Sequence, residues 1–164
     1  MSFRRRGIRQ QRAAKTGNAA THLAQLHRDR KASQNASAVR RAYTGALAER
    51  LGLAVDFIPG DWRQGADPAE IEKRLRADSS RAIKAVCVVH NETSTGVTTP
   101  IAPIRAAIDR TGHPALLLVD TISSLGSIDY RHDEWDVDVT VGGSQKGLML
   151  PPGLSFNAIS GKAL

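Results

Sequence analysis

The sequence has little of what membrane-spanning and secreted proteins need. Only one of its 164 residues is cysteine, which excludes an intramolecular disulfide framework and a cysteine-based zinc cluster. The longest apolar runs, such as residues 115–119, fall far short of the roughly 20 residues of a transmembrane helix. No apolar stretch of a signal peptide follows the basic start. We therefore expect a cytoplasmic protein that makes no contact with a membrane.

Acidic residues are nearly absent from positions 1–50, which hold twelve Lys and Arg against two Asp and Glu. Positions 51–164 hold eleven and fourteen, so the net charge of +7 arises entirely in the N-terminal part. A nucleic-acid-binding domain more often carries basic charge on its folded part. We therefore do not expect nucleic acid to be a partner of the folded region.

Residues 1–39 are rich in Arg, Gln, Ala, Ser and Asn and show no sustained helical or alternating period. Such a composition buries too little apolar surface to offset the entropy of ordering, so we predict a disordered leader. Three explanations for it stay open: an organelle-targeting peptide, a nucleic-acid-binding arm, or a non-native start produced by truncation or a shifted reading frame, which we favour.

From residue 40 onward, helices and strands are predicted in alternation. Asp67, Pro68 and Glu70 supply a helix N-cap, a proline at the first helical position and a capping-box glutamate. Gly52 and Gly112 are placed to end helices. The order predicts an α/β fold with a mostly parallel sheet and helices packed on it over residues 40–164. Predicted helices cover residues 43–51, 67–77 and 101–111, and predicted strands cover residues 53–58, 83–89, 115–119, 137–141 and 154–159.

Two of the predicted strands differ in their pattern of burial. Residues 83–89 form a β-branched run typical of a strand buried on both faces. Val137, Val139 and Val141 alternate with polar residues, which predicts a strand with one face toward water.

Polar clusters follow three of the predicted strands where each strand ends: residues 90–96 (HNETSTG), 120–124 (DTISS) and 142–147 (GGSQKG). Because ligands bind beyond the carboxyl ends of strands in α/β sheets, we expect these segments to lie together. That arrangement would bring hydroxyls, an amide, the carboxylate of Asp120 and the amine of Lys146 to one edge.

Each of these groups also has a purely structural explanation. Asp120 is placed like a helix cap, His90 like a satisfied histidine, Lys146 like a solvated lysine and Cys87 like a small core residue. The combination is what pyridoxal phosphate requires: a lysine for the Schiff base, a carboxylate for the pyridine nitrogen, and donors for the phosphate and the phenolic oxygen. A phosphate-binding loop of the G-x-x-x-x-G-K-[ST] type, a dinucleotide fingerprint and a zinc-spaced histidine pair are missing from the sequence.

The three motifs resemble those of the class V, fold-type I aminotransferases, above all the serine–glyoxylate and alanine–glyoxylate types. The matching segments are HNETSTG at 90–96, LVDTISSLG at 118–126, and GSQKG at 143–147 followed by PPG at 151–153. The resemblance covers roughly Ala46 to the end. It implies part of a pyridoxal-phosphate-binding large domain, amino transfer from serine or alanine to glyoxylate to give glycine, and a homodimer at full length.

The resemblance also implies a role for five residues. Lys146 would form the Schiff base and then carry a proton between the substrate's α carbon and the cofactor. Asp120 would pair with the pyridine nitrogen, and Ile122 would press against the ring. Thr93 would hydrogen-bond near the phenolic oxygen, and Gln145 would contact the phosphate.

The family pattern is not complete in this chain. His90 and Glu92 match the motif without an assigned role. Family members contain an upstream phosphate-binding turn, a residue that stacks on the ring, and a C-terminal domain whose arginine grips the substrate carboxylate; we find no counterpart in residues 1–39 or before Leu164. Since the likeness fades between Arg41 and Ala46, we expect a fragment that does not catalyse transamination alone.

Two rival hypotheses remain. Another class V enzyme, such as a cysteine desulfurase, would usually place a histidine before the lysine and need a mobile cysteine. Here Gln145 precedes Lys146, and Cys87 lies within a predicted strand. The second rival is a non-catalytic remnant with a basic nucleic-acid-binding arm, whose binding would depend steeply on salt.

Overall fold

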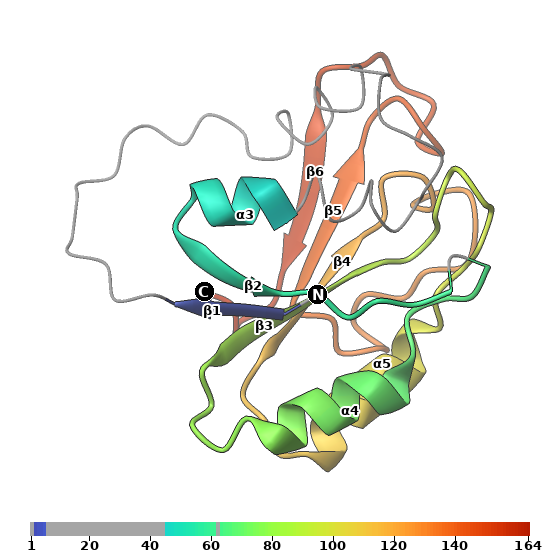
Figure 1. Cartoon of the computed structure of the whole chain (residues 1–164). Coiled ribbons are helices and arrows are strands. Elements are labelled where there is room, and N and C mark those ends of the chain that lie inside the picture. Colours follow the sequence, from blue (N-terminus) through green and yellow to red (C-terminus); the bar gives the residue numbers. More distant parts are fainter. Residues whose placement is uncertain (1, 6–44, 62) are drawn as a thin grey trace.

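The computed structural model describes residues 2–5, 45–61 and 63–164, which form a sheet with helices on both faces (Figure 1). The strands are β1 (Ser2–Arg5), β2 (Leu53–Asp56), β3 (Ile83–Val89), β4 (Leu116–Asp120), β5 (Val139–Gly143) and β6 (Ser155–Ile159), and the helices are α3 (Ala46–Arg50), α4 (Pro68–Ala77) and α5 (Ile101–Arg110).

The six strands lie in the order β2-β1-β3-β4-β5-β6. Strands β3, β4 and β5 are parallel neighbours, whereas β1 is antiparallel to β2 and β3, and β6 is antiparallel to β5. Four strands, β2 to β5, therefore run in one direction. This confirms the predicted α/β fold with a mostly parallel sheet.

The local sequence signals set the helix ends as predicted. The Asp67 carboxylate accepts a hydrogen bond from the Ala69 N–H at 2.8 Å, and Pro68 is the first residue of α4. Gly52 and Gly112 take φ angles of 79° and 59° after α3 and α5, a conformation that costs glycine little. The start of α4 and the ends of α3 and α5 therefore follow these local signals, whereas no side-chain hydrogen bond caps the start of α3 or α5.

The main core lies between the sheet and the pair α4 and α5, and α3 covers the other face (Figure 1). Ile104, Ile108 and Leu117 are fully buried in the main core. On the α3 side, Ala48 packs toward Ala85 in a smaller cluster. Apolar side chains thus cover both faces of the parallel strands, as the β-branched run of residues 83–89 predicts. Lys84, near the start of β3, is an exception and is exposed.

The predicted disordered leader is wrong for Ser2–Arg5, which form β1 between β2 and β3. The physical reason lies in the backbone. A strand between two others pairs its N–H and C=O groups on both sides, and this gain is invisible to an argument from side-chain composition. Residue 1 and residues 6–39 lie outside the described residues. The disorder of the leader and the domain boundary between residues 39 and 40 therefore stay predictions.

The prediction that the polar face of β5 lies toward water is also wrong. Thr140 points into the main core with 4% of its surface exposed, while Val139 and Val141 are only half-buried. The Thr140 hydroxyl is satisfied there, because it lies 2.6 Å from the Tyr130 hydroxyl and 2.7 Å from Nδ1 of His132. Burying a hydroxyl that has hydrogen-bond partners costs little free energy. The alternation of polar and apolar residues therefore predicted the wrong face of β5 as the buried one.

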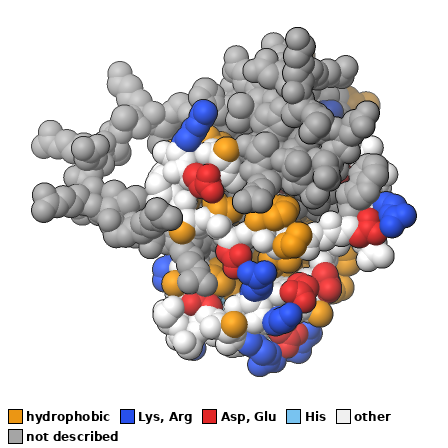
Figure 2. All heavy atoms as spheres, viewed as in Figure 1, with side chains coloured by type: hydrophobic (Ala, Val, Ile, Leu, Met, Phe, Trp, Pro, Cys, Tyr) orange, Lys and Arg blue, Asp and Glu red, His pale blue; other side chains and the backbone are white. Residues whose placement is uncertain are grey.

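Acidic and basic side chains are interspersed over α4 and α5 (Figure 2). Glu72, for example, binds Arg76 and Arg110 at 2.7 and 2.6 Å. Exposed pairs of this kind stabilise a fold only slightly. Within the described part of the chain, no helix is both long and apolar enough to cross a bilayer.

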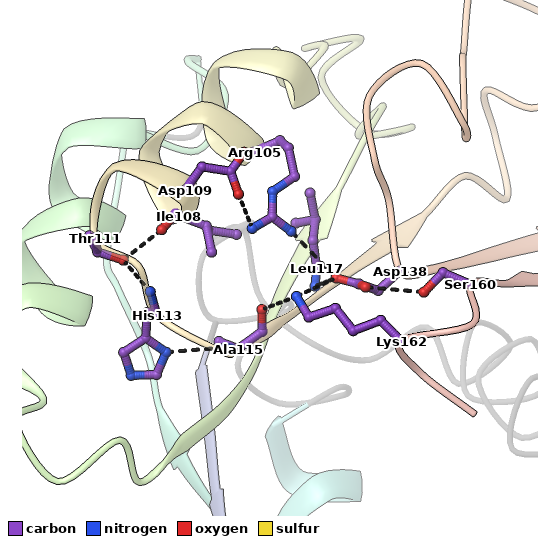
Figure 3. Close-up of polar contacts among 10 residues, drawn as sticks. All are labelled: Arg105, Ile108, Asp109, Thr111, His113, Ala115, Leu117, Asp138, Ser160 and Lys162. Carbon is purple, nitrogen blue, oxygen red and sulfur yellow. Dashed lines mark hydrogen bonds and ion pairs between the residues drawn. The ribbon is translucent and has the colours of Figure 1, made fainter.

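A buried carboxylate, Asp138, joins the amino ends of β4 and β5 to the chain after β6 (Figure 3). It accepts hydrogen bonds from the Leu117 N–H at 2.8 Å and the Ser160 hydroxyl at 3.1 Å. Arg105 and Lys162 approach the same carboxylate to 3.4 and 3.5 Å. Since a buried charge is tolerated only with such partners, these contacts fix this edge of the sheet.

A second buried carboxylate, Asp78, lies between α4 and β3. It accepts hydrogen bonds from the Ile83 N–H at 2.6 Å and the Ser80 hydroxyl at 2.9 Å, and His113 lies 3.4 Å away. Burial raises the pKa of Asp78, but these hydrogen bonds outweigh it and lower the pKa to about 2. The ionised form is therefore part of the folded state.

Asp78 gives the fold a defined sensitivity to acid. The pKa of its carboxyl is about 2 when folded and 3.8 without the fold, so its stabilisation is nearly complete above about pH 5 and is lost as the pH falls from about 5 to about 2. We expect Asp78→Asn to lower the free energy of unfolding by about 2 kcal/mol at neutral pH, with the deficit shrinking across that window in urea titrations.

The matched control is Ser80→Ala, which removes one of the hydrogen bonds and keeps the carboxylate. It should retain part of the acid dependence. A deficit for Asp78→Asn that stays constant from pH 7 to pH 2 would contradict this assignment.

Candidate functional site

The three polar segments expected to converge do lie at one edge of the sheet. In the parallel ladder, Asp120 at the end of β4 pairs with Val89 of β3 on one side and Val141 of β5 on the other. The His90 N–H donates to the Asp120 carbonyl at 2.9 Å, and the Thr121 N–H donates to the Val141 carbonyl at 2.8 Å. The carboxyl ends of β3, β4 and β5 are therefore held side by side.

Asp120 is half-buried, and its side chain is set by the turn that follows it. The Asp120 carboxylate accepts a hydrogen bond from the Ile122 N–H at 2.9 Å. The Leu125 N–H donates to the Thr121 carbonyl at 2.8 Å and closes the turn. Alternation along β4 places Asp120 on the face of Leu118, opposite the buried Val119.

The segment after β3 is tied to this turn. The Ser123 hydroxyl donates to the Asn91 carbonyl at 2.7 Å. Further along, the Glu92 carboxylate accepts a hydrogen bond from the Ser94 hydroxyl at 2.9 Å, which shapes the loop. The side chain of Thr93, at the tip of this loop, is exposed. Its expected part in cofactor binding remains a prediction.

The lysine loop is built around a fully buried serine. The Ser144 hydroxyl donates to the Pro151 carbonyl at 2.7 Å, and the Leu150 N–H donates to the Ser144 carbonyl at 3.0 Å. These bonds hold the loop as a closed turn between β5 and β6. Gln145 and Lys146 lie on its exposed side, where both are free to meet a ligand.

Ile122 and Gln145 converge over Gly143. A Cβ built on Gly143 would lie 3.5 Å from Cγ2 of Ile122 and 3.5 Å from Oε1 of Gln145. Gly143 follows Val141 on the same face of β5, and Val141 pairs with Asp120. The side chains of Ile122 and Gln145 therefore lie together at Gly143, and Asp120 lies on the same face of the neighbouring strand, with Lys146 in the adjoining loop.

This set of groups fits a phosphorylated pyridine aldehyde. An amine can bind the aldehyde, a carboxylate can pair with the ring nitrogen, and an amide can donate to an anion. Asp120, Ile122 and Gln145 share one edge and one face, and Lys146 follows Gln145 directly in the turn. The roles of these residues toward a cofactor stay predictions.

His90 is one of the two motif residues, with Glu92, to which the sequence assigned no role. It is 2% exposed, and its Nδ1 lies 2.9 Å from the Ser124 hydroxyl. Burial lowers the pKa of His90, an effect that Asp129 opposes. The available signal was its position directly after a buried strand, next to a polar cluster.

The turn after β4 contacts the turn that carries Lys146. A Cβ on Gly147 would overlap the Ser127 hydroxyl and the Leu125 carbonyl, and it would lie 2.8 Å from the carbonyl carbon of Gly126. The turn after β4 and the turn after β5 are thus in backbone contact, which only glycine at 147 permits.

We expect Gly147→Ala to force these turns apart at a cost of about 1–3 kcal/mol in the free energy of unfolding, as for other overpacked sites. Gly161→Ala is the control, since a Cβ there meets no atom within 4 Å, and its stability should be unchanged or slightly higher. Equal unfolding midpoints in urea for both variants would show that the turns do not pack in this way.

Comparison with known proteins places these residues in a family. The sequence model of the "Aminotransferase class-V" family matches residues 19–164, so the likeness starts upstream of the expected limit between Arg41 and Ala46. The chain is 57% identical over 118 residues to a serine–glyoxylate aminotransferase of Methylorubrum extorquens, covering 72% of this chain and 29% of the relative. It is 49% identical over 118 residues to an L-aspartate–glyoxylate aminotransferase of Paracoccus denitrificans, covering 72% and 30%.

Among solved structures, an alanine–glyoxylate aminotransferase from Nostoc sp. superposes with a TM-score of 0.64 at 35% identity, over 72% of this chain and 30% of that one. The chain thus spans about 30% of the length of the curated relatives it matches. The family match covers most of the sequence, and the fold is that of part of the fold-type I large domain. The chain belongs to the class-V aminotransferase family.

Proposed function

We propose that this chain forms part of a pyridoxal-phosphate-dependent aminotransferase that moves an amino group from serine or alanine to glyoxylate and gives glycine. The observation that carries the proposal is the position of Asp120, held in register between the ends of β3 and β5. Directly after β5 comes the turn that bears Gln145 and Lys146. The names of the three relatives described above all contain glyoxylate and differ in the amino donor: serine, L-aspartate or alanine.

Each residue has a task that its environment suits. Pyridoxal phosphate, when bound, supplies an electron sink for the substrate's α carbon. Lys146, exposed on its loop, would bind the aldehyde and, once the substrate's amine displaces it, would carry the proton from the α carbon to the cofactor. Asp120 holds a proton on the ring nitrogen, because a half-buried carboxylate favours a cationic partner.

The other three residues orient the ring. Ile122 offers an apolar surface to its face, and Gln145 donates its amide to the phosphate. Thr93, on the exposed loop after β3, would hydrogen-bond near the phenolic oxygen. A homodimer at full length and a cytoplasmic location belong to the same proposal and follow from the resemblance and the sequence composition.

Cys87 does not fit the role of the nucleophile that the desulfurase alternative needs. Desulfurization needs a nucleophilic thiolate on a mobile segment. Cys87 lies within β3 and packs toward the small cluster under α3, and burial raises the pKa of its thiol to about 12. A thiol that stays protonated inside a strand does not supply that nucleophile.

The proposal predicts where pyridoxal phosphate attaches. When the 164-residue chain is incubated with pyridoxal phosphate and reduced with borohydride, the label should be found on Lys146 by peptide mapping. Lys146→Arg keeps the positive charge and should abolish this label. Lys73→Arg, which alters an exposed lysine of α4, should leave it intact. A label spread evenly over the lysines, and unchanged by Lys146→Arg, would refute a specific cofactor site.

A further inference from the structure

His90 connects the main core to the turn that carries Asp120. Its ring packs against Tyr130 and Trp135, with ring centroids 5.1 and 5.9 Å apart. Tyr130 and Trp135 themselves pack on the apolar core between the sheet and α4–α5. The ring of His90 is therefore fixed from one side by large, well-packed neighbours.

On its other side, His90 is bound to the turn after β4 at two points. Nδ1 lies 2.9 Å from the hydroxyl of Ser124, and the backbone N–H donates to the carbonyl of Asp120 at 2.9 Å. Ser124 is fully buried, so its hydroxyl is no nucleophile and depends on His90 for a partner. Removing that partner would leave a buried hydroxyl unsatisfied.

The same turn determines where the Asp120 carboxylate points. Ser124 donates its N–H to the Thr121 carbonyl at 3.0 Å, and Ile122 donates to the Asp120 carboxylate within that turn. A shift of Ser124 therefore changes the turn, and the turn sets the carboxylate. Since burial lowers the pKa of His90, the ring makes its bond to Ser124 without burying a charge.

We propose that His90 is a positioning residue: through its hydrogen bond to Ser124 it fixes the turn that aims the Asp120 carboxylate at the cofactor's ring nitrogen. The inference rests on the proposed function, and it adds a residue on the opposite face of the sheet. A histidine that only filled the core would stabilise the fold and leave the carboxylate's geometry unaffected.

The test separates packing from positioning. His90→Phe combined with Ser124→Ala keeps an aromatic ring against Tyr130 and Trp135 and leaves no orphaned hydroxyl, so stability should be largely retained. The readout is the absorbance of pyridoxal phosphate bound to Lys146, titrated with pH. If the carboxylate is misplaced, the ring nitrogen loses its proton, and the neutral ring withdraws less electron density from the nitrogen of Lys146. The pH at the midpoint of the absorbance titration should therefore rise by roughly one unit.

Ser124→Ala alone should give a shift in the same direction, which keeps the test valid if the double variant does not fold. His90→Asn, whose amide can reach Ser124, should give a smaller shift. The matched control is Tyr130→Phe, which removes the bond to Thr140 in the same aromatic cluster and should lower stability without moving the midpoint.

The outcomes distinguish the inference from the proposed function. A normal midpoint in Ser124→Ala and in the double variant, with a shifted midpoint in Asp120→Asn, would overturn the role of His90 and leave the function standing. Failure of the unmodified chain to bind pyridoxal phosphate at Lys146 would overturn both.

Discussion

The candidate site depends on the register of β4 between its two parallel neighbours. Leu117 and Val119 face the core against α4 and α5, while Leu118 and Asp120 face the other way. A slip of one residue would reverse every side chain of the strand and turn the carboxylate of Asp120 into an apolar core. Burying an unpaired carboxylate is strongly unfavourable, so the hydrophobic pattern of five residues also fixes the direction of the functional group.

The carboxylates at the two edges of the sheet differ in burial. At the amino edge, the carboxylates of Asp78 and Asp138 are almost wholly buried and bind backbone N–H groups of β3 and β4. At the carboxyl edge, Asp120 is half-buried, and Lys146 and Gln145 are exposed. The buried carboxylates of Asp78 and Asp138 hold the strands through hydrogen bonds within the protein. The exposed amine of Lys146 is accessible to a ligand.

Much of the fold could be predicted because its signals are local. The cap at Asp67, the stop at Gly112 and the apolar run of β3 each act within a few residues. The strand Ser2–Arg5 could not be predicted, since its stability comes from pairing with β2 and β3, which are distant in sequence. The buried face of β5 was misassigned because Thr140 finds its partners, Tyr130 and His132, only in the folded chain.

The site shows the same division. Motif spacing placed Asp120, Ile122, Gln145 and Lys146 at one edge, because parallel strands align their carboxyl ends. The connection from His90 to Ser124 crosses between two loops 34 residues apart. A hydrogen bond of that kind follows from the register of the strands, and no pattern within either loop encodes it.

The proposed function depends most directly on Asp120, which would keep a proton on the ring nitrogen of a cofactor bound at Lys146. Nitrogen-15 NMR of the chain loaded with pyridoxal phosphate labelled at the ring nitrogen measures that proton directly. The account predicts a protonated ring nitrogen in the unmodified chain at neutral pH and an unprotonated one in Asp120→Asn. The same protonation state in both proteins would contradict it.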